Sequence, residues 1–166
     1  ITVAPIGVNK ELILKTITKL GHYYDQIILC GYPPFIKDVI DDAAGHDVTW
    51  LDYHIKIINA AEGFSENFRN YIAKKAGLKN ILTDSVNIYG TVEFGAMAHE
   101  TALTNLIRRL ALNNQEVFQS LFKDAHRLPT LAQYYPHQIY FEEVNGEVIA
   151  TGYGSAIPLI RYRFPD

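Results

Sequence analysis

Short apolar runs alternate along the first two thirds of the chain with longer segments in which apolar residues recur every three or four positions. The short runs predict four buried strands, at 1–6, 26–30, 55–59 and 81–88. The periodic segments predict helices at about 9–20, 35–44, 65–76 and 97–112. Because strands and helices alternate, the pattern predicts an α/β fold with a mostly parallel sheet flanked by helices.

Residues with strong positional preferences mark several of these boundaries. Asn9 and Ser65 are of the type that caps a helix N-terminus, and Gly21 and Gly77 stand where two helices should end. The pair Pro33-Pro34 cannot continue a strand ladder, so the second strand should stop there and a helix should begin.

The pattern changes after residue 112. A short helix is expected at 115–122 and a loop rich in helix breakers at 124–136, followed by β-like runs at 138–144, 147–151 and 158–162. Asn145-Gly146, between the first two runs, is the strongest hairpin signal in the chain. The sequence therefore predicts an antiparallel β section that follows the α/β core.

Composition limits the classes of partner. Of the 166 residues, 48% are apolar and 20% are charged, which suits one domain with a real core. The net charge of −3, with no basic block, argues against a nucleic-acid partner. No apolar run approaches the roughly 20 residues of a membrane helix and no signal-peptide pattern is present, so no membrane partner is expected. The single cysteine, Cys30, is expected to be a buried thiol in a reducing cytoplasm.

The stretch Asn87-Ile88-Tyr89-Gly90-Thr91-Val92-Glu93-Phe94-Gly95 is the most informative for function. We expect a strand that ends in a glycine turn and leads into a helix, which leaves backbone N–H groups available for phosphate. Tyr89 suits the face of a purine, and Glu93 suits a divalent cation near phosphates. Taken alone, a Tyr-Gly turn with a later glutamate is also consistent with plain structure.

Two further strand ends should contribute to the same region. Small residues in Ala60-Ala61-Glu62-Gly63 let a flat ligand approach the backbone at the end of the third strand. In parallel α/β sheets, ligands bind beyond the carboxyl ends of the strands. The turns at Tyr32, Ala61 and Tyr89 are therefore expected on one rim.

Four motifs, in order, resemble those of adenylate-forming acyl ligases, and most of all the phenylacetate–CoA ligase group. Tyr89-Gly90-Thr91-Val92-Glu93 is similar to the family's Tyr-Gly-x-Thr/Ser-Glu motif. Ala60-Ala61-Glu62-Gly63 is similar to its adenine-lining Gly-Ala-Glu-Pro turn, and Gly31-Tyr32-Pro33-Pro34 occupies its aromatic-proline position. Residues 146–152 and then 157–163, with a terminal Asp166, resemble the motifs that close the family's large domain.

The resemblance implies an ATP- and Mg²⁺-dependent ligase that activates a small carboxylic acid as its adenylate and then forms a thioester with CoA. It implies that residues 1–112 form the nucleotide-binding core and that 113–166 form a loop and β section of one partial domain, ending at a hinge aspartate. Tyr89 would stack on adenine, and Asp166 would accept hydrogen bonds from the ribose hydroxyls. The implied site residues are Ala60, Ala61, Glu62, Tyr89, Gly90, Thr91 and Asp166 for the nucleotide, Glu93 for Mg²⁺ and catalysis, and Tyr32 and His99 for the acyl group.

The chain departs from the family pattern in ways that bear on activity. Val92 stands where the family has Ser or Thr, so a phosphate-facing hydroxyl is missing, and Phe164-Pro165 is unusual before Asp166. No Gly/Ser/Thr-rich phosphate loop ending in Lys is present, and no second domain with a catalytic Lys follows. We therefore expect a fragment that is inactive in adenylation alone. The alternative is a noncatalytic nucleotide-binding or interaction domain on the same scaffold.

Other polar residues have simpler interpretations. Arg108-Arg109 is expected on a solvated helix face, with recognition of an acidic substrate as the alternative. His99-Glu100 is expected as a pair on a helix surface, with a substrate contact as the alternative. The six histidines are scattered without zinc-ligand spacing.

Overall fold

The computed structural model describes residues 1–123, 125–153 and 157–164. The helices are α1 (Lys10–Leu20), α2 (Pro33–Asp42), α3 (Glu66–Ala76), α4 (Ala102–Asn113) and α5 (Gln115–Phe122). The strands are β1 (Ile27–Gly31), β2 (Ile55–Asn59), β3 (Ser85–Thr91), β4 (Gly95–His99), β5 (Gln133–Tyr134), β6 (Ile139–Val144), β7 (Glu147–Gly152) and β8 (Leu159–Arg163). Short 3-10 turns lie at Gly21–Tyr23, Ala43–His46 and Trp50–Asp52.

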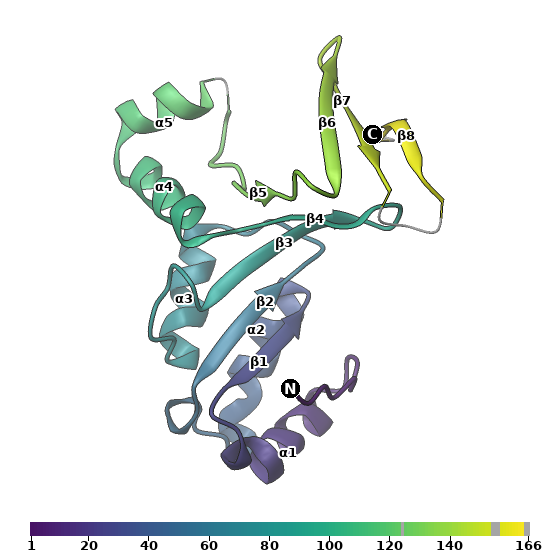
Figure 1. The fold of residues 1–166 in the computed structure, drawn as a ribbon. Coiled ribbons are helices and arrows are strands. Elements are labelled where there is room, and N and C mark those ends of the chain that lie inside the picture. Colours follow the sequence, from purple (N-terminus) through teal and green to yellow (C-terminus); the bar gives the residue numbers. More distant parts are fainter. Residues whose placement is uncertain (124, 154–156, 165–166) are drawn as a thin grey trace.

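The strands form two sheets (Figure 1). Within the described residues, the first sheet has the order β1-β2-β3-β4-β5 and the second the order β6-β7-β8. β1, β2 and β3 are parallel, and α2 and α3 connect them; β4 and β5 add to the sheet in antiparallel fashion. The second sheet is antiparallel throughout. The predicted α/β fold, with a mostly parallel sheet and then an antiparallel β section, is confirmed.

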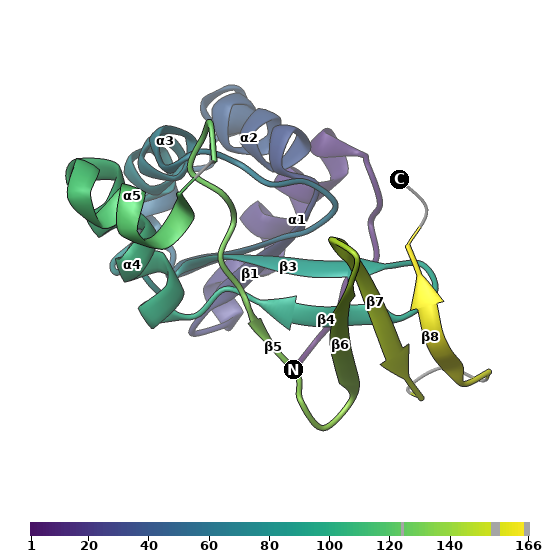
Figure 2. The ribbon, with the colours of Figure 1, turned by 90° about the horizontal axis from the view of Figure 1, so that it is seen from above.

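Helices α1, α2 and α3 lie together on one face of the first sheet (Figure 2). Apolar positions with helical spacing, such as Leu14 and Ile17 of α1, meet alternate positions of the strands, such as Ile55 and Ile57 of β2, and all four are buried. In β1, the Leu29 side chain faces this core, so the side chains of Ile28 and Cys30 point to the opposite face of the sheet. The Cys30 thiol is therefore exposed, and the prediction that it is buried was wrong.

The predicted end signals are confirmed for two helices and a hairpin. Asn9 Oδ1 accepts a hydrogen bond from Leu12 N at 3.0 Å, and Ser65 Oγ accepts one from Phe68 N at 3.2 Å. Asn145 and Gly146 have φ of 55° and 83°, as a two-residue turn between twisted strands requires. None of the helices in the described part of the chain is both long and apolar enough to cross a membrane.

Three predicted elements differ in the structure. Residues 1–6 form no strand and are mostly exposed, because no described strand pairs with the outer side of β1. The fourth strand begins at Ser85 instead of residue 81, because an Asn80-centred turn occupies the intervening residues. The helix predicted at 97–112 begins only at Ala102, where Thr101 forms a capping box.

The residues before Ala102 form β4, which was not predicted. Gly95 has a φ of 68°, a conformation that glycine adopts freely, and it closes a hairpin in which β4 runs back along β3. Met97 is buried by packing against Ile139 and Ala150 of the second sheet, and Ala98, which pairs with Tyr89 of β3, is buried as well. Apolar residues in a short run do not distinguish such a strand from the first turn of a helix.

A polar contact between α2 and α3 predicts a pH-dependent contribution to stability. The pKa of the Asp41 carboxyl is lowered by a hydrogen bond from Lys37 and a second one from Tyr71. Because the pKa is depressed on folding, this stability is present above the ordinary carboxyl pKa near 4 and lost as the pH falls through the folded value. Asp41→Asn should lower the free energy of unfolding by about 1 kcal/mol at pH 7 and by much less near pH 3 in urea titrations.

Asp38→Asn, on the same helix but exposed, is the matched control and should change little at either pH. An Asp41→Asn effect that persists undiminished at low pH would contradict the assignment.

Candidate functional site

The carboxyl ends of β1 and β2 lie side by side at one rim, and Asn59 at the end of β2 pairs with Asn87 in the middle of β3. β3 continues through Tyr89 to Thr91, so the expected turn at Tyr89 is absent. Ala60 N donates a hydrogen bond to the Gly31 carbonyl at 3.1 Å, which joins the segments that follow β1 and β2. The Tyr32 hydroxyl lies 3.4 Å from Glu62 Oε1, and Asn87 Nδ2 of β3 donates to the Glu62 carbonyl at 2.9 Å. The segments that follow β1 and β2 and the middle of β3 therefore converge on residues 60–62.

One hollow of about 370 Å³ opens at this rim, and we call it the Ala60 hollow. Its walls are small and mostly apolar, which suits a compact apolar group or the approach of a ligand to backbone. A Cβ atom at Gly90 would overlap the Gly95 carbonyl, so glycine is required where the hairpin strands come close. The lining residues are Ala60, Ala61, Ile88, Gly90, Thr91, Val92, Gly95 and Ala96.

A second hollow of about 370 Å³ contains Tyr89, and we call it the Tyr89 hollow. Side chains of successive strand residues point to opposite faces, so Tyr89 projects away from Ile88 and the Ala60 hollow. Tyr89 is half-exposed and shares this hollow with two other aromatic rings. Its lining residues are Tyr89, Ala98, Thr130, Ala132, Tyr134 and Phe141. The structure thus places Tyr89 and Ala61 in different hollows instead of one slot.

Glu93 lies exposed in the turn between β3 and β4. Its own backbone N–H, together with the side chains of Thr91 and Tyr162, holds the pKa of the carboxyl below its usual range by hydrogen bonding. The turn leads into a strand, so the expected helix N-terminus beside it is absent and α4 begins beyond β4. Phosphate recognition by backbone N–H groups of a helix at this turn is therefore excluded.

The donor set around Glu93 limits what kind of metal site it can form. Within the described residues no group of three or more His, Cys, Asp or Glu side chains could hold a metal ion. A single exposed carboxylate still fits Mg²⁺, which is commonly held by one or two carboxylates together with substrate phosphates and water. Glu93 therefore fits Mg²⁺ as one ligand completed by phosphate and water oxygens, and the described part of the chain holds no cluster of three or more such protein ligands.

The remaining predicted site residues are dispersed. Tyr32 lies on the rim but lines neither hollow. His99 ends β4, stacks on Tyr135 with ring centroids 5.3 Å apart, and lines neither hollow. Asp166 lies outside the described residues.

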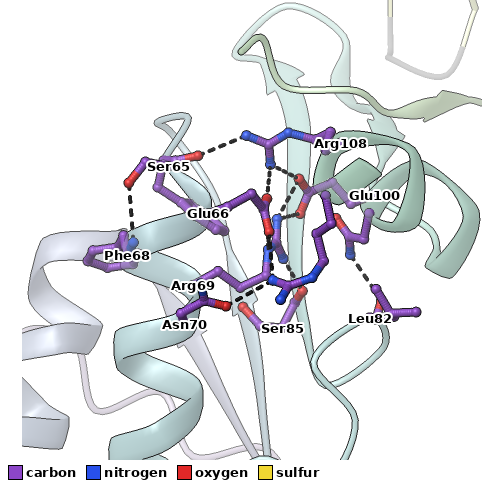
Figure 3. A network of polar contacts seen from close by, with 12 residues as sticks. Ser65, Glu66, Phe68, Arg69, Asn70, Leu82, Ser85, Glu100 and Arg108 are labelled. Carbon is purple, nitrogen blue, oxygen red and sulfur yellow. Dashed lines mark hydrogen bonds and ion pairs between the residues drawn. The ribbon is translucent and has the colours of Figure 1, made fainter. Parts of the chain in front are cut away.

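A buried network of four charges lies directly behind the rim (Figure 3). Arg69 Nη2 lies 2.8 Å from both carboxylate oxygens of Glu100, and Arg69 Nε lies 3.1 Å from Glu66 Oε2. Arg108 Nη1 is 2.9 Å from a carboxylate oxygen of each glutamate. All four side chains are at most 2% exposed. The formal charges cancel, as burial of ions demands.

The same side chains hold the backbone of the rim. Arg108 donates to the carbonyls of Phe64 at 3.1 Å and Pro129 at 2.9 Å. Arg69 donates to the Ser85 carbonyl, and Glu100 accepts from Asn87 N at 2.8 Å. The network therefore links α3, α4, the start of β3 and the segment that follows β2.

The network was missed in the sequence, where Arg108 was predicted on a solvated face and His99-Glu100 on a helix surface. Both predictions were wrong, because Arg108 and Glu100 are 1% exposed and His99-Glu100 lies at a strand end. The helical spacing of three of the network residues indicated that they are buried, although their charge suggested that they are exposed. Glu66 and Arg69 extend the buried stripe of α3, and Arg108 extends that of α4; the stripe positions are 66, 69, 72, 73 and 76, and 104, 105, 108 and 111.

Comparisons with known proteins identify no family. No protein-family model matches the chain, and no curated protein matches it. Among solved structures, the chain is similar to apo MatB from Rhodopseudomonas palustris, with a TM-score of 0.47 and 13% sequence identity over 87% of this chain. The similarity covers 24% of that protein, so the chain spans about a quarter of its length. A likeness at this level identifies neither the activity nor the ligand of the chain.

Substitution of one charged member of the network should strongly destabilise the fold, because it leaves a buried charge without a partner. Glu100→Gln should lower the free energy of unfolding by about 3–5 kcal/mol, measured by urea denaturation. Glu143→Gln, at an exposed position of β6, is the matched control and should stay within about 0.5 kcal/mol of wild type. Equal, small effects of the two substitutions would show that the network does not support the fold.

Proposed function

We propose that this chain forms the nucleotide-binding side of an ATP-dependent ligase that activates a carboxylic acid as its adenylate and transfers it to a thiol acceptor such as CoA. The observation that carries the proposal is the convergence of two parallel strand ends and the middle of a third strand on residues 60–62, beside a hollow that Gly90 and Thr91 also line. Open α/β sheets bind ligands at this edge. The order of the motifs along the sequence agrees with this placement.

Tyr89 supplies the surface for adenine in this proposal. Its ring is half-exposed, and Tyr134 and Phe141 add aromatic walls to the same hollow. Stacking of a base on an aromatic ring contributes about 1–3 kcal/mol. Tyr89 projects from the face of β3 opposite the Ala60 hollow, so in this proposal a base stacked on its ring lies in the Tyr89 hollow, and Ala60, Ala61 and Glu62 contact other parts of the nucleotide.

Ala61 carries backbone strain at the proposed nucleotide edge. Its φ is 77°, a left-handed conformation that costs an alanine about 1–2 kcal/mol. Such strain persists where the surrounding structure enforces it, and it is concentrated at ligand-binding sites. Ala61 is also exposed, so no core packing accounts for the conformation.

Glu93 is proposed to hold Mg²⁺ that accompanies ATP, and the Thr91 hydroxyl supports the turn instead of the phosphates. Mg²⁺, when bound, supplies positive charge that offsets the phosphate oxygens during adenylation. Thr91 Oγ1 accepts a hydrogen bond from Phe94 N at 3.3 Å. Val92 next to it is fully exposed and cannot replace the missing hydroxyl. The chain therefore contributes orientation and charge, which dominate this kind of chemistry.

The remaining proposed contacts complete the outline of the site. Tyr32, on the rim beside Glu62, and His99, at the end of β4, are proposed to border the acyl group, and Asp166 to accept hydrogen bonds from the ribose. The second candidate is a noncatalytic nucleotide-binding or interaction domain, which the lack of a hydroxyl at Val92 favours.

Binding of AMP tests the proposal. Calorimetric titration of the chain with AMP should show weak binding, with a dissociation constant on the order of 1 mM, and Tyr89→Ala should weaken it about tenfold through loss of stacking. Tyr140→Ala removes an exposed tyrosine of β6 and is the matched control.

Pyrophosphate–ATP exchange by the complete ligase distinguishes the candidates. Carboxylate-dependent exchange that falls on Glu93→Ala supports the enzyme. AMP binding without any exchange supports the noncatalytic domain. Exchange that survives both Tyr89→Ala and Glu93→Ala would contradict the site assignment.

The strain at Ala61 gives an independent prediction. Ala61→Gly should raise the free energy of unfolding by about 0.5–1 kcal/mol, because glycine adopts positive φ freely. Ala60→Gly, where φ is not positive, is the control and should lower it by about the same amount. Denaturation curves in which both substitutions destabilise equally would show that Ala61 is not strained.

A further inference from the structure

Helix α4 turns a polar side to the molecule and an apolar side to solvent. The positions that it buries are mostly polar; they are Thr104, Asn105, Arg108 and Ala111. Its other side carries Leu103, Leu106 and Leu110, which are 64%, 42% and 53% exposed. An amphipathic helix normally buries its apolar side against the rest of the protein. In α4 that side is left uncovered.

Four apolar residues of α4 form one continuous stripe. Leu103, Leu106, Ile107 and Leu110 have the spacing i, i+3, i+4 and i+7, which places them on one side of a helix over two turns. Ile107 is half-buried and the three leucines are exposed. We call these four residues the leucine stripe. Helices pack along one another through stripes with this spacing.

The helix that follows adds to the same region. In both ribbon views α4 and α5 lie at the edge of the molecule (Figures 1 and 2). Asn114 Oδ1, between the two helices, accepts hydrogen bonds from Glu116 N at 2.9 Å and Val117 N at 3.2 Å, so α5 starts directly where α4 ends. α5 has no buried residue although four of its side chains are apolar; they are Val117, Phe118, Leu121 and Phe122.

The distribution of charge limits which partner fits the leucine stripe. None of its residues is charged, and Arg109 beside it is held by Glu66 Oε2 at 3.3 Å and Asn70 Oδ1 at 2.9 Å. A two-fold axis brings equal groups of two copies together, so a stripe without charge meets no like-charge repulsion. Helices that bind anionic membranes carry several Lys or Arg residues on the polar side. The basic residues of α4 and α5 are Arg108 and Arg109, and both are engaged with Glu66.

The exposed area is of the size that a dimer requires. A standard interface takes about 800 Å² from each partner, and about 65% of a homodimer interface is apolar. A leucine that is about half exposed contributes on the order of 100 Å². The three leucines of the stripe and Leu121, which is 53% exposed, therefore supply most of the apolar part. The half-buried residues of α5 add to it.

We propose that the leucine stripe is the contact surface of a homodimer, in which two copies of α4 pack antiparallel about a two-fold axis. Antiparallel packing places opposite ends of the two helix dipoles together. The axis passes close to Leu106, in the middle of the stripe, so that Leu103 of one copy meets Leu110 of the other. The dimer covers the second side of the helix that carries Arg108, and it does not depend on the proposed nucleotide site.

Sedimentation velocity of the whole chain tests for the dimer. Wild type should change from monomer to dimer as its concentration rises, with a dissociation constant on the order of 10 µM. Leu106→Glu places a charge against its own copy and should raise that constant roughly hundredfold. Leu12→Glu, at a position of α1 that is 48% exposed, is the matched control and should dimerise as wild type does. Both variants should keep the circular dichroism spectrum of wild type.

Disulfide cross-linking tests the antiparallel arrangement. The background is Cys30→Ser, which removes the single cysteine of the chain. Leu103→Cys mixed with Leu110→Cys should form a mixed disulfide dimer on oxidation, whereas neither variant alone should cross-link to a comparable extent. Leu106→Cys, close to the axis, should cross-link to its own copy.

Each contrary outcome is distinct. A wild-type chain that stays monomeric at about 100 µM overturns the proposal, as does a dimer that Leu106→Glu leaves intact. Cross-linking of Leu103→Cys with itself in preference to Leu110→Cys overturns the antiparallel packing. Binding of the monomer to vesicles of anionic lipid, lost in Leu106→Glu, would assign the stripe to a membrane surface and overturns the dimer.

Discussion

Two guanidinium groups and two carboxylates buried between α3 and α4 are the constraint on which the site region depends. Removing such ions from water costs several kcal/mol each, and only close pairing with further hydrogen bonds offsets it. Arg69 and Arg108 meet that requirement by bonding to both glutamates and to three backbone carbonyls. Since every partner must stay in place, the network fixes the relative positions of two helices, one strand and two loops.

The loop after β2 shows what this rigidity allows. Its end is held by the bond from Arg108 to the Phe64 carbonyl, and its middle by the bond from Asn87 to the Glu62 carbonyl. Its start is held by the bond from Ala60 to Gly31. With three anchors within five residues, the loop can keep Ala61 at a φ of 77° without relaxing. A rim that keeps its shape without a ligand loses less conformational entropy when a ligand binds.

Helix caps and turn residues determined most of the secondary structure and were visible in the sequence. The elements that were not predicted depend on pairing between different segments of the chain. Asn9, Ser65 and Asn145-Gly146 act within a few residues, so the elements they bound were predictable. β4 is a strand only because β3 lies beside it, and nothing in Gly95–His99 alone decides this. Arg108 was predicted to be solvated because its charge was given more weight than its position on the buried stripe of the helix. The separation of Tyr89 from Ala61 follows from strand alternation on β3, which the motif alone did not indicate.

The hairpin in place of a helix changes which part of the molecule can act on Glu93. A helix following the turn would have kept the carboxylate close to the first sheet, where backbone N–H groups supply the charge complement. The hairpin instead carries the turn to the second sheet, where the ring of Phe94, next to Glu93, contacts Tyr162 of β8 at 5.7 Å between centroids. A phenol adds no positive charge, so Tyr162 beside the turn forms no ion pair with the carboxylate. An arginine or lysine in the same place would instead occupy the carboxylate as an ion pair. The contacts of this turn with Tyr162 and Phe164 are therefore aromatic, and those two residues leave the charge of Glu93 uncompensated.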